Sequence, residues 1–423
     1  MPYLSRIVDM ELDELLPALP AVSLEGAKGV GKTETALHRA KTICRLDDPA
    51  QWSIAQADPD RLLAGEKPIL IDEWQRLPPI WDKVRRAVDS GTRPGSFLLT
   101  GSAHPSTPPT HSGAGRVVTL RMRPLSLAER KLEAPTVSLS ELLEGGHPDI
   151  GGKTEVSLAD YTEEIVRSGF PGLRALTGRP LRAQLDGYIQ RIVDVDFAEM
   201  GLEVRRPQLL RRWMAAYAAA TSTNASYETI RDAATPGEAD KPARTTTIPY
   251  RDVLERLWIL DPIPAWAPTR NPISRLIRSP KHQLVDPALA ARLLGVGVDA
   301  LLSGENAGYP IPRDGTLLGH LFESLAALSV RVYAQAAEAS VGHMRTASGA
   351  KEVDMIVERA DRRVIAIEVK LGNTIENHDV RHLQWLQQQL GEDLLDAIVI
   401  STGREAYRRK DGIAVVPAAL LGP

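Results

Sequence analysis

The sequence has little cysteine, little excess charge and no long hydrophobic run. Its one cysteine, Cys44, excludes an intrachain disulfide, argues against a zinc cluster and fits a reducing compartment. A formal charge of −3 over 423 residues gives no basic surface across the whole protein, so nucleic-acid binding would depend on local patches. No run reaches the roughly eighteen apolar residues of a membrane helix, and the N-terminus MPYLSRIVDMELDELL lacks the apolar core of a secretory signal. These absences predict a soluble, cytoplasmic protein with no membrane partner.

What the chain does contain predicts two or three α/β and helical domains. Hydrophobic residues make up 43% and charged residues 25%, as in ordinary globular proteins. Helix and strand patterns alternate over the first 130 residues, the middle has helical spacing, and a long helical pattern from 316 leads into strand patterns at 352–357 and 364–370. The sequence therefore predicts a domain over 1–130, a linker over 131–155, a helical section over 156–300 and a second α/β domain over 301–423.

The segment GAKGVGKT, residues 26–33, predicts a phosphate-binding loop. It fits G-x-x-x-x-G-K-[ST] and lies between an apolar strand pattern, AVSL, and a helical pattern, ETALHRAKTICRL. Glycines let backbone N–H groups approach the phosphates, Lys32 would reach the β- and γ-phosphates, and Thr33 would bind Mg²⁺. The residues expected to contact ATP are Gly26, Ala27, Lys28, Gly29, Val30, Gly31, Lys32, Thr33 and Glu34. The alternative is a glycine-rich turn without a ligand.

Two further strand patterns end in polar residues that suit ATP hydrolysis. PILIDEW ends in Asp72, expected to hold Mg²⁺, and Glu73, expected to polarise the attacking water, which a small-molecule kinase would not need. SFLLTGSA ends in Thr100 and Ser102, one of which is a candidate sensor of the γ-phosphate because parallel sheets gather ligand contacts at this end. Both hydroxyls are also ordinary turn residues.

The segment GRVVTLRMRPLSLAER supplies candidate arginine fingers. These are Arg116, Arg121 and Arg123, of which Arg116 is the first choice. A finger can act within the chain or on a neighbouring subunit, so an oligomer is compatible with the sequence. Solvated surface arginines are the competing interpretation.

The two C-terminal strand patterns carry an unusual set of charges. In VIAIEVK, residues 364–370, alternation places Glu368 and Lys370 on one face, and KEVDMIV would place Asp354 almost opposite Glu368 in a hairpin. Facing carboxylates repel unless a cation lies between them, and Mg²⁺ prefers such oxygen ligands. A half-buried edge strand with a solvated ion pair is the alternative.

Several motifs together resemble one family. GAKGVGKT, LIDEWQRLP, LLTGSA, GRVVTLRMRPLSLAE, SGFPGLRAL, YIQRIVDVDF, SPKHQLVDPALAARLLG and LLGHLFESLAA resemble the prokaryotic AAA-type ATPases that carry an uncharacterised nuclease-like C-terminal domain. The resemblance implies an N-terminal P-loop ATPase with a parallel sheet, a helical, winged-helix-like middle and a C-terminal α/β domain similar to restriction endonucleases. In that domain D…E-x-K is similar to the PD-(D/E)XK core, with Asp354 and Glu368 on the metal and Lys370 catalytic. Glu323 matches an added metal-binding acid.

The middle departs from the winged-helix pattern implied for residues 205–290. NASYETIRDAA and IPYRDVLERLWIL would be the two helices of a helix-turn-helix, but the connection between them is far longer than usual. A more basic stretch, TRNPISRLIRSPKH, is a candidate for phosphate contact through Arg270, Arg275, Arg278 and Lys281. A solvated hairpin between domains is the alternative.

The sequence as a whole predicts Mg²⁺-dependent ATP hydrolysis coupled to a nuclease-like domain acting on DNA, with ATP and Mg²⁺ as cofactors. The alternative is an ATP-switched, antitoxin-like interaction protein whose nuclease-like domain does not cleave and which binds a protein partner.

Overall fold

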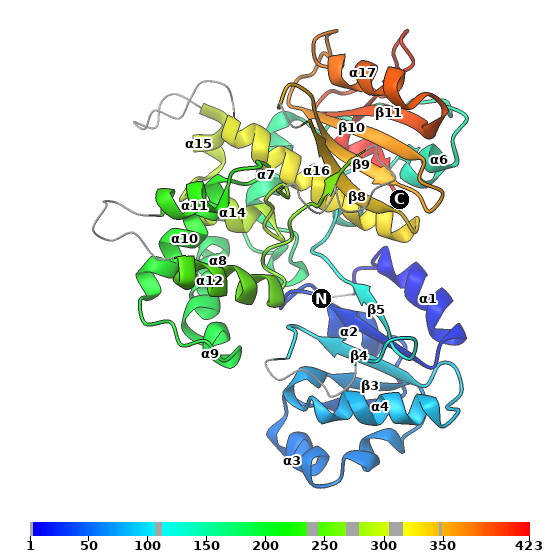
Figure 1. The fold of residues 1–423 in the computed structure, drawn as a ribbon, viewed down its shortest axis with the longest axis vertical. Coiled ribbons are helices and arrows are strands. Elements are labelled where there is room, and N and C mark those ends of the chain that lie inside the picture. The colour runs from blue at the N-terminus through cyan, green and yellow to red at the C-terminus, as the bar shows by residue number, and fades with distance from the viewer. Residues whose placement is uncertain (1–2, 106–111, 235–243, 268–278, 304–315, 347–348) are drawn as a thin grey trace.

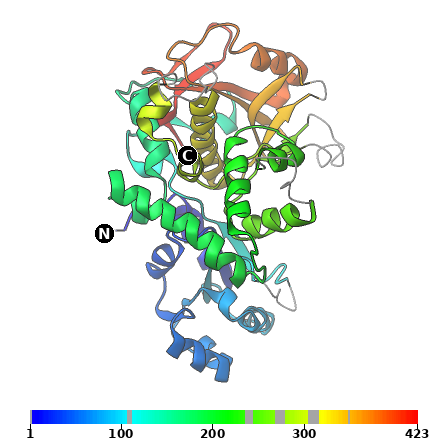
Figure 2. The same cartoon turned by 90° about the vertical axis from the view of Figure 1, so that its left-hand side faces the viewer.

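The structure of the chain is a computed structural model. It describes residues 3–105, 112–234, 244–267, 279–303, 316–346 and 349–423. Two β-sheets lie at opposite ends of the molecule, and a helical section lies beside the region between them (Figures 1 and 2). No helix in these described ranges has the length and apolar composition needed to cross a membrane.

The N-terminal sheet is entirely parallel, with strand order β2-β3-β4-β1-β5. Its strands are β1 (Ala21–Glu25), β2 (Thr42–Arg45), β3 (Ile69–Asp72), β4 (Phe97–Gly101) and β5 (Val118–Arg121). The helices of this part are α1 (Val8–Ala18), α2 (Lys32–Leu37), α3 (Pro49–Ala57) and α4 (Pro79–Asp89). Every residue of β1, β3 and β4 is buried, which explains their nearly continuous apolar sequences, since a central parallel strand is covered on both faces.

The helix predicted after the phosphate loop is too long. The predicted pattern ETALHRAKTICRL extends to Leu46, but α2 ends at Leu37 and TICR forms β2 at the edge of the sheet. β2 pairs with β3 from Thr42↔Ile69 to Arg45↔Asp72. Pairing with β3 outweighs the helical spacing of a short apolar run, which by itself fits either structure.

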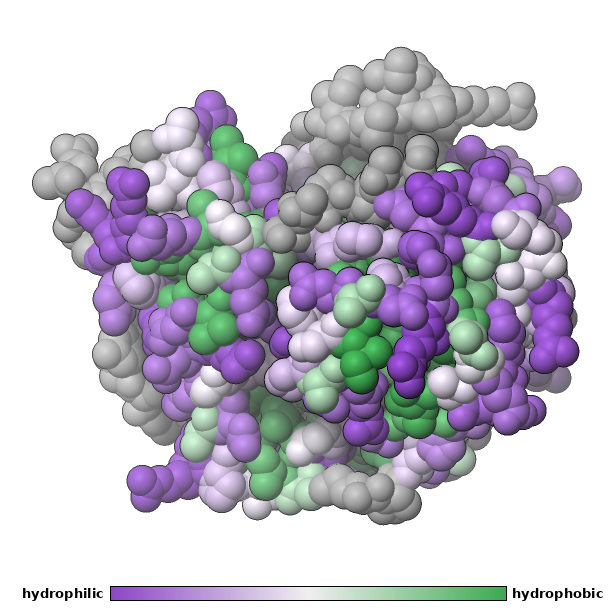
Figure 3. Space-filling model, turned by 90° about the horizontal axis from the view of Figure 1, so that it is seen from below, coloured by the Kyte–Doolittle hydropathy of each residue, from purple (hydrophilic) through white to green (hydrophobic). Residues whose placement is uncertain are grey.

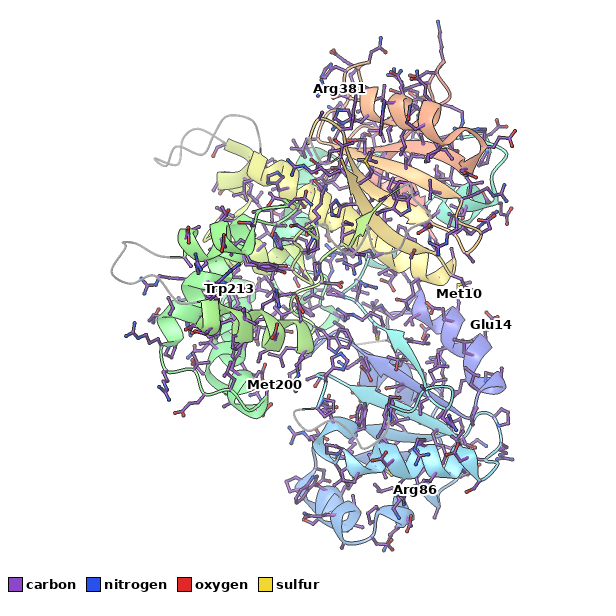
Figure 4. The ribbon with its side chains drawn as sticks, viewed as in Figure 1. Met10, Glu14, Arg86, Met200, Trp213 and Arg381 are labelled. Atoms are coloured by element: carbon purple, nitrogen blue, oxygen red, sulfur yellow. The ribbon has the colours of Figure 1, made fainter. Side chains whose placement is uncertain are left out.

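The middle of the described chain is mainly helical, as predicted. Its helices are α5 (Leu127–Arg130), α7 (Leu158–Arg167), α8 (Gly178–Arg191), α9 (Phe197–Glu199), α10 (Pro207–Ala219), α11 (Tyr227–Ala233), α12 (Arg244–Arg256), α14 (Pro287–Leu293) and α15 (Val298–Ser303). A π-helical turn at Ile192–Asp196 joins α8 to α9. Trp213 of α10 is buried in the centre of this section (Figure 4).

Helices α10, α11 and α12 are followed by two short segments that run antiparallel to each other. The two segments meet at the bridges Leu260↔Leu284 and Ile263↔Lys281, and we call residues 259–263 and 281–285 the linking hairpin. The predicted second helix of the helix-turn-helix starts earlier than expected, at Arg244, and most of the long connection before it lies outside the described residues.

The C-terminal sheet has seven strands in the order β12-β13-β11-β10-β9-β8-β7. They are β7 (Ala265–Trp266), β8 (Ser340–Arg345), β9 (Glu352–Glu358), β10 (Val364–Lys370), β11 (Leu394–Ser401), β12 (Tyr407–Arg408) and β13 (Ala414–Pro417). Helix α16 (Thr316–Ala336) covers one face and α17 (Arg381–Leu390) the other (Figure 1). Arg381 marks the first turn of α17 at the far end of the molecule (Figure 4).

The edge-strand interpretation of VIAIEVK is wrong. β10 lies in the middle of the sheet, antiparallel to β9 and parallel to β11, and Glu368 is only 3% exposed. Ile365, Ile367 and Val369 pack in the core on the α16 side, as alternation predicts, while Ala366 packs in a second core under α17. Glu368 is therefore a buried carboxyl group that needs polar partners.

Alternation fails in the neighbouring strand β9. Val353 and Ile356 pack in the same core under α17, although strict alternation puts them on opposite faces. The cause is a shift of register against β8, between Gly342↔Ile356 and Met344↔Val353. Asp354 lies within this irregularity, and such bulges re-aim side chains.

The predicted linker over 131–155 contains packed structure. It forms β6 (Val137–Ser138) and α6 (Leu139–Glu144), whose Leu139, Leu142 and Leu143 are buried. β6 pairs in parallel with β14 (Leu421–Gly422) at the end of the chain. Polar and glycine-rich composition suggested a loop, but these leucines cover part of the C-terminal sheet.

Candidate functional site

The phosphate loop lies between β1 and α2, as its motif predicts. Gly29 and Gly31 have φ values of 84° and 103°, a backbone region that residues with a side chain rarely adopt. Gly26 lies against the backbone of Met122, where an added Cβ would be 2.1 Å from the carbonyl oxygen. These glycines allow the compact turn from which backbone N–H groups can reach phosphates. Glu34, in the first turn of α2, is exposed.

Lys32 is buried in this loop and contacts its carbonyl groups. Its Nζ donates to the Gly26 and Ala27 carbonyl oxygens at 2.8 and 2.9 Å. Burial lowers the pKa of Lys32 to about 8, although Glu73 and Asp72 favour its charged form. A buried ammonium with only neutral carbonyl partners is well prepared to bind an anionic phosphate.

Asp72 is linked to the phosphate loop by hydroxyl groups. Thr33 Oγ1 donates to Asp72 Oδ1 at 2.8 Å, and Thr100 Oγ1 donates to the same oxygen. Burial raises the pKa of Asp72, and the two hydroxyl hydrogen bonds oppose this effect. Thr33 and Asp72, predicted as Mg²⁺ ligands, are thus brought together with oxygen atoms that suit this ion.

Glu73 is held by side chains from two strand ends. Ser102 Oγ donates to Glu73 Oε2 at 2.7 Å, and Gln75 Nε2 donates to Glu73 and to Ser102. Glu73 has a left-handed backbone conformation with φ 57°, which is uncommon for a residue with a side chain and is typical of constrained sites. Gln75 was missed by sequence reasoning, although its position two residues after Glu73 was a usable signal.

The predicted arginine fingers have other partners. Arg116, half exposed, pairs through Nε with Asp89 at 2.8 Å and does not join the group around Lys32 and Glu73. The half-buried Arg121 and Arg123 lie 3.6 and 2.8 Å from Asp261 of the linking hairpin. Arg121 also stacks on Trp258 at 3.7 Å, and burial lowers its pKa to about 10. Within one chain, Arg121 and Arg123 connect the N-terminal domain to the linking hairpin, and Arg116 pairs with the last residue of α4.

The helical section contacts the phosphate loop directly. Lys28 Nζ pairs with Asp196 at 2.7 Å and Glu199 at 3.2 Å, and the Tyr188 hydroxyl donates to the Lys28 carbonyl oxygen. A cavity of about 470 Å³ lies between the two parts, with Glu73 and Ser102 on one side and Met200 on the other. Figure 4 shows Met200 on the side of the helical section that faces the N-terminal sheet, and Figure 3 shows a depression between two mainly hydrophilic lobes.

A second group of charges gathers in the C-terminal sheet. Extending the β9–β10 register by one residue places Asp354 opposite Glu368, as predicted, and the Val369 N–H donates to Asp354 at 2.9 Å. Lys370 Nζ lies 2.9 Å from Glu368 Oε2. Glu323 reaches the same group from α16. The structure therefore brings together the four C-terminal residues singled out in the sequence.

A residue from the linking hairpin lies inside this group. Lys281 is 1% exposed, and its Nζ lies 2.8 Å from Glu323, 3.0 Å from Asp354 and 3.6 Å from Glu352. The predicted phosphate contact through Lys281 is therefore wrong, since its ammonium is buried among carboxylates. The other basic residues of that stretch, Arg270, Arg275 and Arg278, lie outside the described residues.

The C-terminal carboxylates have strongly perturbed pKa values. Burial and the Asp354 charge raise the pKa of Glu323 to about 8, and the same two causes raise that of Glu368 well above its usual value. Burial also disfavours ionisation of Asp354, but Lys281 and Lys370 outweigh it and lower its pKa. Such opposed shifts are typical of functional sites and of buried ion-pair networks.

The C-terminal group has oxygen donors for a divalent ion but is not arranged around one. Across the part of the chain that the structure describes, no three His, Cys, Asp or Glu side chains form a ready metal cluster. Glu368 Oε1 is nevertheless buried without a hydrogen-bond partner. A Glu368 carboxylate oxygen without a hydrogen-bond partner, on the strand next to Asp354, fits the hard oxygen chemistry of Mg²⁺, so the residue types suit the ion although Lys281 lies among them.

Comparison with protein families assigns the N-terminal part. Residues 19–131 match the AAA domain, residues 158–300 the domain of unknown function DUF8612, and residues 318–421 the domain of unknown function DUF4143. The first match confirms the predicted AAA-type P-loop ATPase domain, which implies nucleotide binding and supports ATP hydrolysis, with Mg²⁺ generally expected. The other two matches assign no activity to these parts of the chain.

Related proteins and structures were also found. Uncharacterized proteins of Mycobacterium tuberculosis and Mycobacterium bovis are each 27% identical over 414 residues, covering 96% of this chain and 82% of the relative. The Walker-type ATPase of Pyrococcus abyssi covers 69% of this chain and 96% of its own, with 13% identity and a TM-score of 0.39. The Thermotoga maritima RuvB Holliday junction branch migration motor covers 60% and 88%, with 16% identity and a TM-score of 0.26. TM-scores this low add nothing to the assignment.

Proposed function

We propose that this protein hydrolyses ATP with Mg²⁺ and that nucleotide turnover controls a nuclease-like C-terminal domain acting on DNA. The observation that supports the ATPase proposal is the meeting of Lys32, Asp72 and Glu73 at the carboxyl ends of β1 and β3. Thr33 and Ser102 are hydrogen-bonded to the two acids. In an open parallel sheet this edge is where ligands bind.

The side chains of the loop have distinct roles in this proposal. Lys32 exchanges its carbonyl partners for phosphate oxygens and balances their charge. Glu73 accepts a hydrogen bond from the attacking water and orients it, while Ser102 and Gln75 fix the carboxylate and respond to the γ-phosphate. Thr33 and Asp72 would hold Mg²⁺, which supplies charge neutralisation on the phosphates.

The first test removes the loop ammonium. Lys32→Ala is expected to weaken ATP binding by about 10- to 100-fold, because a hydrogen bond to a charged group contributes about 1.5–3 kcal/mol. Isothermal titration with ATP and Mg²⁺ measures the affinity. Lys41→Ala is the matched control, since Lys41 pairs with Glu66 on the exposed surface. Equal affinity in the Lys32 variant and the control would contradict the proposed site.

The C-terminal group suggests metal-dependent cleavage of DNA as a second activity. The supporting observation is that Asp354, Glu368 and Lys370 come together with Glu323 although they lie on three elements. Asp354 and Glu368 would hold the metal, which activates water and stabilises charge, and Lys370 would stabilise the charge that develops on the phosphate. Glu323 would complete the carboxylate set.

A cleavage assay tests this second activity. Asp354→Ala is expected to lower Mg²⁺- or Mn²⁺-dependent nicking of DNA by about 100-fold or more, because a metal ligand supports several kcal/mol of transition-state stabilisation. ATP hydrolysis should be unchanged. Asp361→Ala is the control, since Asp361 lies on the turn of the same hairpin and pairs with Arg359 and Arg363. Wild-type protein that never nicks DNA or RNA with either metal would exclude this activity.

One observation favours the alternative of an ATP-switched interaction protein that does not cleave. Lys281 already compensates the carboxylates of the C-terminal group, as a purely structural ion cluster would require. A protein partner retained in an ATP-dependent pull-down and indifferent to Asp354→Ala would support this alternative.

A further inference from the structure

The C-terminal carboxylates enclose a positive charge that another part of the fold supplies. We define the carboxylate cage as Glu323 on α16, Asp354 on β9 and Glu368 on β10. Lys281 Nζ contacts two of its members within 3.0 Å. An ammonium that is 1% exposed is rare in proteins and requires such compensation. The same oxygen atoms cannot bind Lys281 and a divalent metal ion together.

Two lysines already supply positive charge to the cage. Lys281 contributes a single positive charge, and Lys370 contributes a second through Glu368. Glu368 Oε1 is left buried without a hydrogen-bond partner, so one acceptor in the cage is unused while Lys281 is in place. A divalent ion replacing the ammonium would add one charge and could use this oxygen.

Lys281 is carried by the linking hairpin and not by the sheet that forms the cage. Its backbone exchanges two hydrogen bonds of 2.9 Å with Ile263, and the neighbouring His282 carbonyl accepts from Ser222 of the helical section. After its first side, the chain forms the two-residue strand β7 at the edge of the C-terminal sheet, where it pairs with β8 and not with the central strands. Withdrawal of Lys281 would therefore leave the central strands of the cage intact.

The end of α12 and the residues that lead into the linking hairpin lie beside the segment that follows β4. The His104 N–H donates to the Arg256 carbonyl at 3.0 Å, and Arg256 Nη2 donates to the Pro105 carbonyl at 2.8 Å. The His104 ring also packs on Trp258, with ring centroids 4.5 Å apart. These contacts form a continuous path from the nucleotide-binding strand ends to the hairpin that holds Lys281.

We propose that Lys281 is a built-in cation that keeps divalent metal out of the carboxylate cage, and that metal enters when the linking hairpin withdraws it. This inference rests on the proposed C-terminal metal site and names its regulation. It makes Lys281 a gate of the site, distinct from Lys370, which stays on the strand next to Glu368.

The test counts Mn²⁺ bound to the full chain without nucleotide, by electron paramagnetic resonance of free Mn²⁺. Lys281→Met keeps the length of the side chain and removes its charge. It is expected to bind one more Mn²⁺ per chain than wild type, with at least tenfold higher affinity at that site, and the double variant Lys281→Met/Asp354→Asn should lose this ion. Lys351→Met, at the residue just before β9, is the control and should bind as wild type does.

Two results would overturn the proposal. In the first, the Lys281→Met protein has the circular dichroism spectrum of a folded protein but binds no additional Mn²⁺. In the second, the wild-type protein already binds a Mn²⁺ ion at this site, and Asp354→Asn removes it. If the Met variant does not fold, Lys281→Gln replaces it in the same count. The experiment measures metal binding and not cleavage. If no variant nicks DNA, the proposed nuclease activity is excluded, but the result on Mn²⁺ binding still tests the role of Lys281.

Discussion

Glu73→Gln is expected to lower the rate of ATP hydrolysis by about 10²- to 10⁴-fold while ATP still binds, since removal of a general base typically has this effect. Gln has nearly the same shape and can keep the hydrogen bonds with Ser102 and Gln75, but it cannot accept a proton from water. Phosphate release under saturating ATP measures the rate, and titration with ATP measures binding.

The control for this substitution is Glu66→Gln. Glu66 is an exposed carboxylate of the same domain that pairs with Lys41 on the surface. Its replacement should leave the rate unchanged. A Glu73→Gln protein that hydrolyses ATP as fast as this control would remove Glu73 from the mechanism and point to a different water-positioning residue.

Asp261→Asn is expected to lower the free energy of unfolding by about 3–5 kcal/mol, the usual effect of removing one member of a buried ion cluster. The Asp261 carboxylate lies 2.8 Å from Arg123 and 2.8 Å from Arg331, and Arg121 is 3.6 Å away. The cluster joins β5, the linking hairpin and α16. Loss of the carboxylate would leave three largely buried guanidinium groups without their shared anion.

The same cluster makes stability depend on pH. Burial disfavours ionisation of Asp261, but Arg123, Arg331 and Arg121 outweigh it and lower its pKa far below the ordinary value of 3.8. The stabilisation is therefore complete above about pH 4 and is lost as the pH falls from there towards the folded-state pKa. Asp261→Asn should lack this component of acid sensitivity.

Urea unfolding followed by tryptophan fluorescence measures both effects, because Trp258 stacks on Arg121 beside the cluster. The control is Asp361→Asn, since Asp361 is an exposed acid paired with two arginines on a turn, and this change should leave the urea midpoint unchanged. If Asp261→Asn and the control unfold at the same urea concentration, the cluster does not stabilise the fold.

The sequence was most informative where chemistry depends on neighbours along the chain. The phosphate loop is a contiguous motif, and Asp72 and Glu73 follow a buried strand, so their meeting at one sheet edge was predictable from parallel pairing. The β9–β10 hairpin was predictable for the same reason, since a short turn fixes its register. These features needed no knowledge of the remaining fold.

The sequence was least informative where partners lie far apart. Lys281 and Asp354 are separated along the chain by α14, α15, α16 and β8. No local pattern indicates that a lysine in a basic stretch is buried among acids. β8 was missed because SVGHMR contains a glycine and little alternation. Arg121 and Arg123 were candidate arginine fingers because no acidic partner was evident nearby in the sequence. Their common partner, Asp261, is 138 residues from Arg123.

The pairing of β6 with β14 has a consequence for the order in which the chain folds. About 250 residues separate the end of α6 at 144 from the start of β11 at 394, the strand that α6 helps to cover. A ribosome adding about 5–20 residues per second needs roughly 10–50 s to make them. For that time the apolar side of α6 lacks β11, the last strand that it packs against, and Thr136 has no Leu420 carbonyl to bind. A translation-arrested chain that ends before β11 should therefore be cut by protease near residues 137–144, and chains released at full length should be protected there.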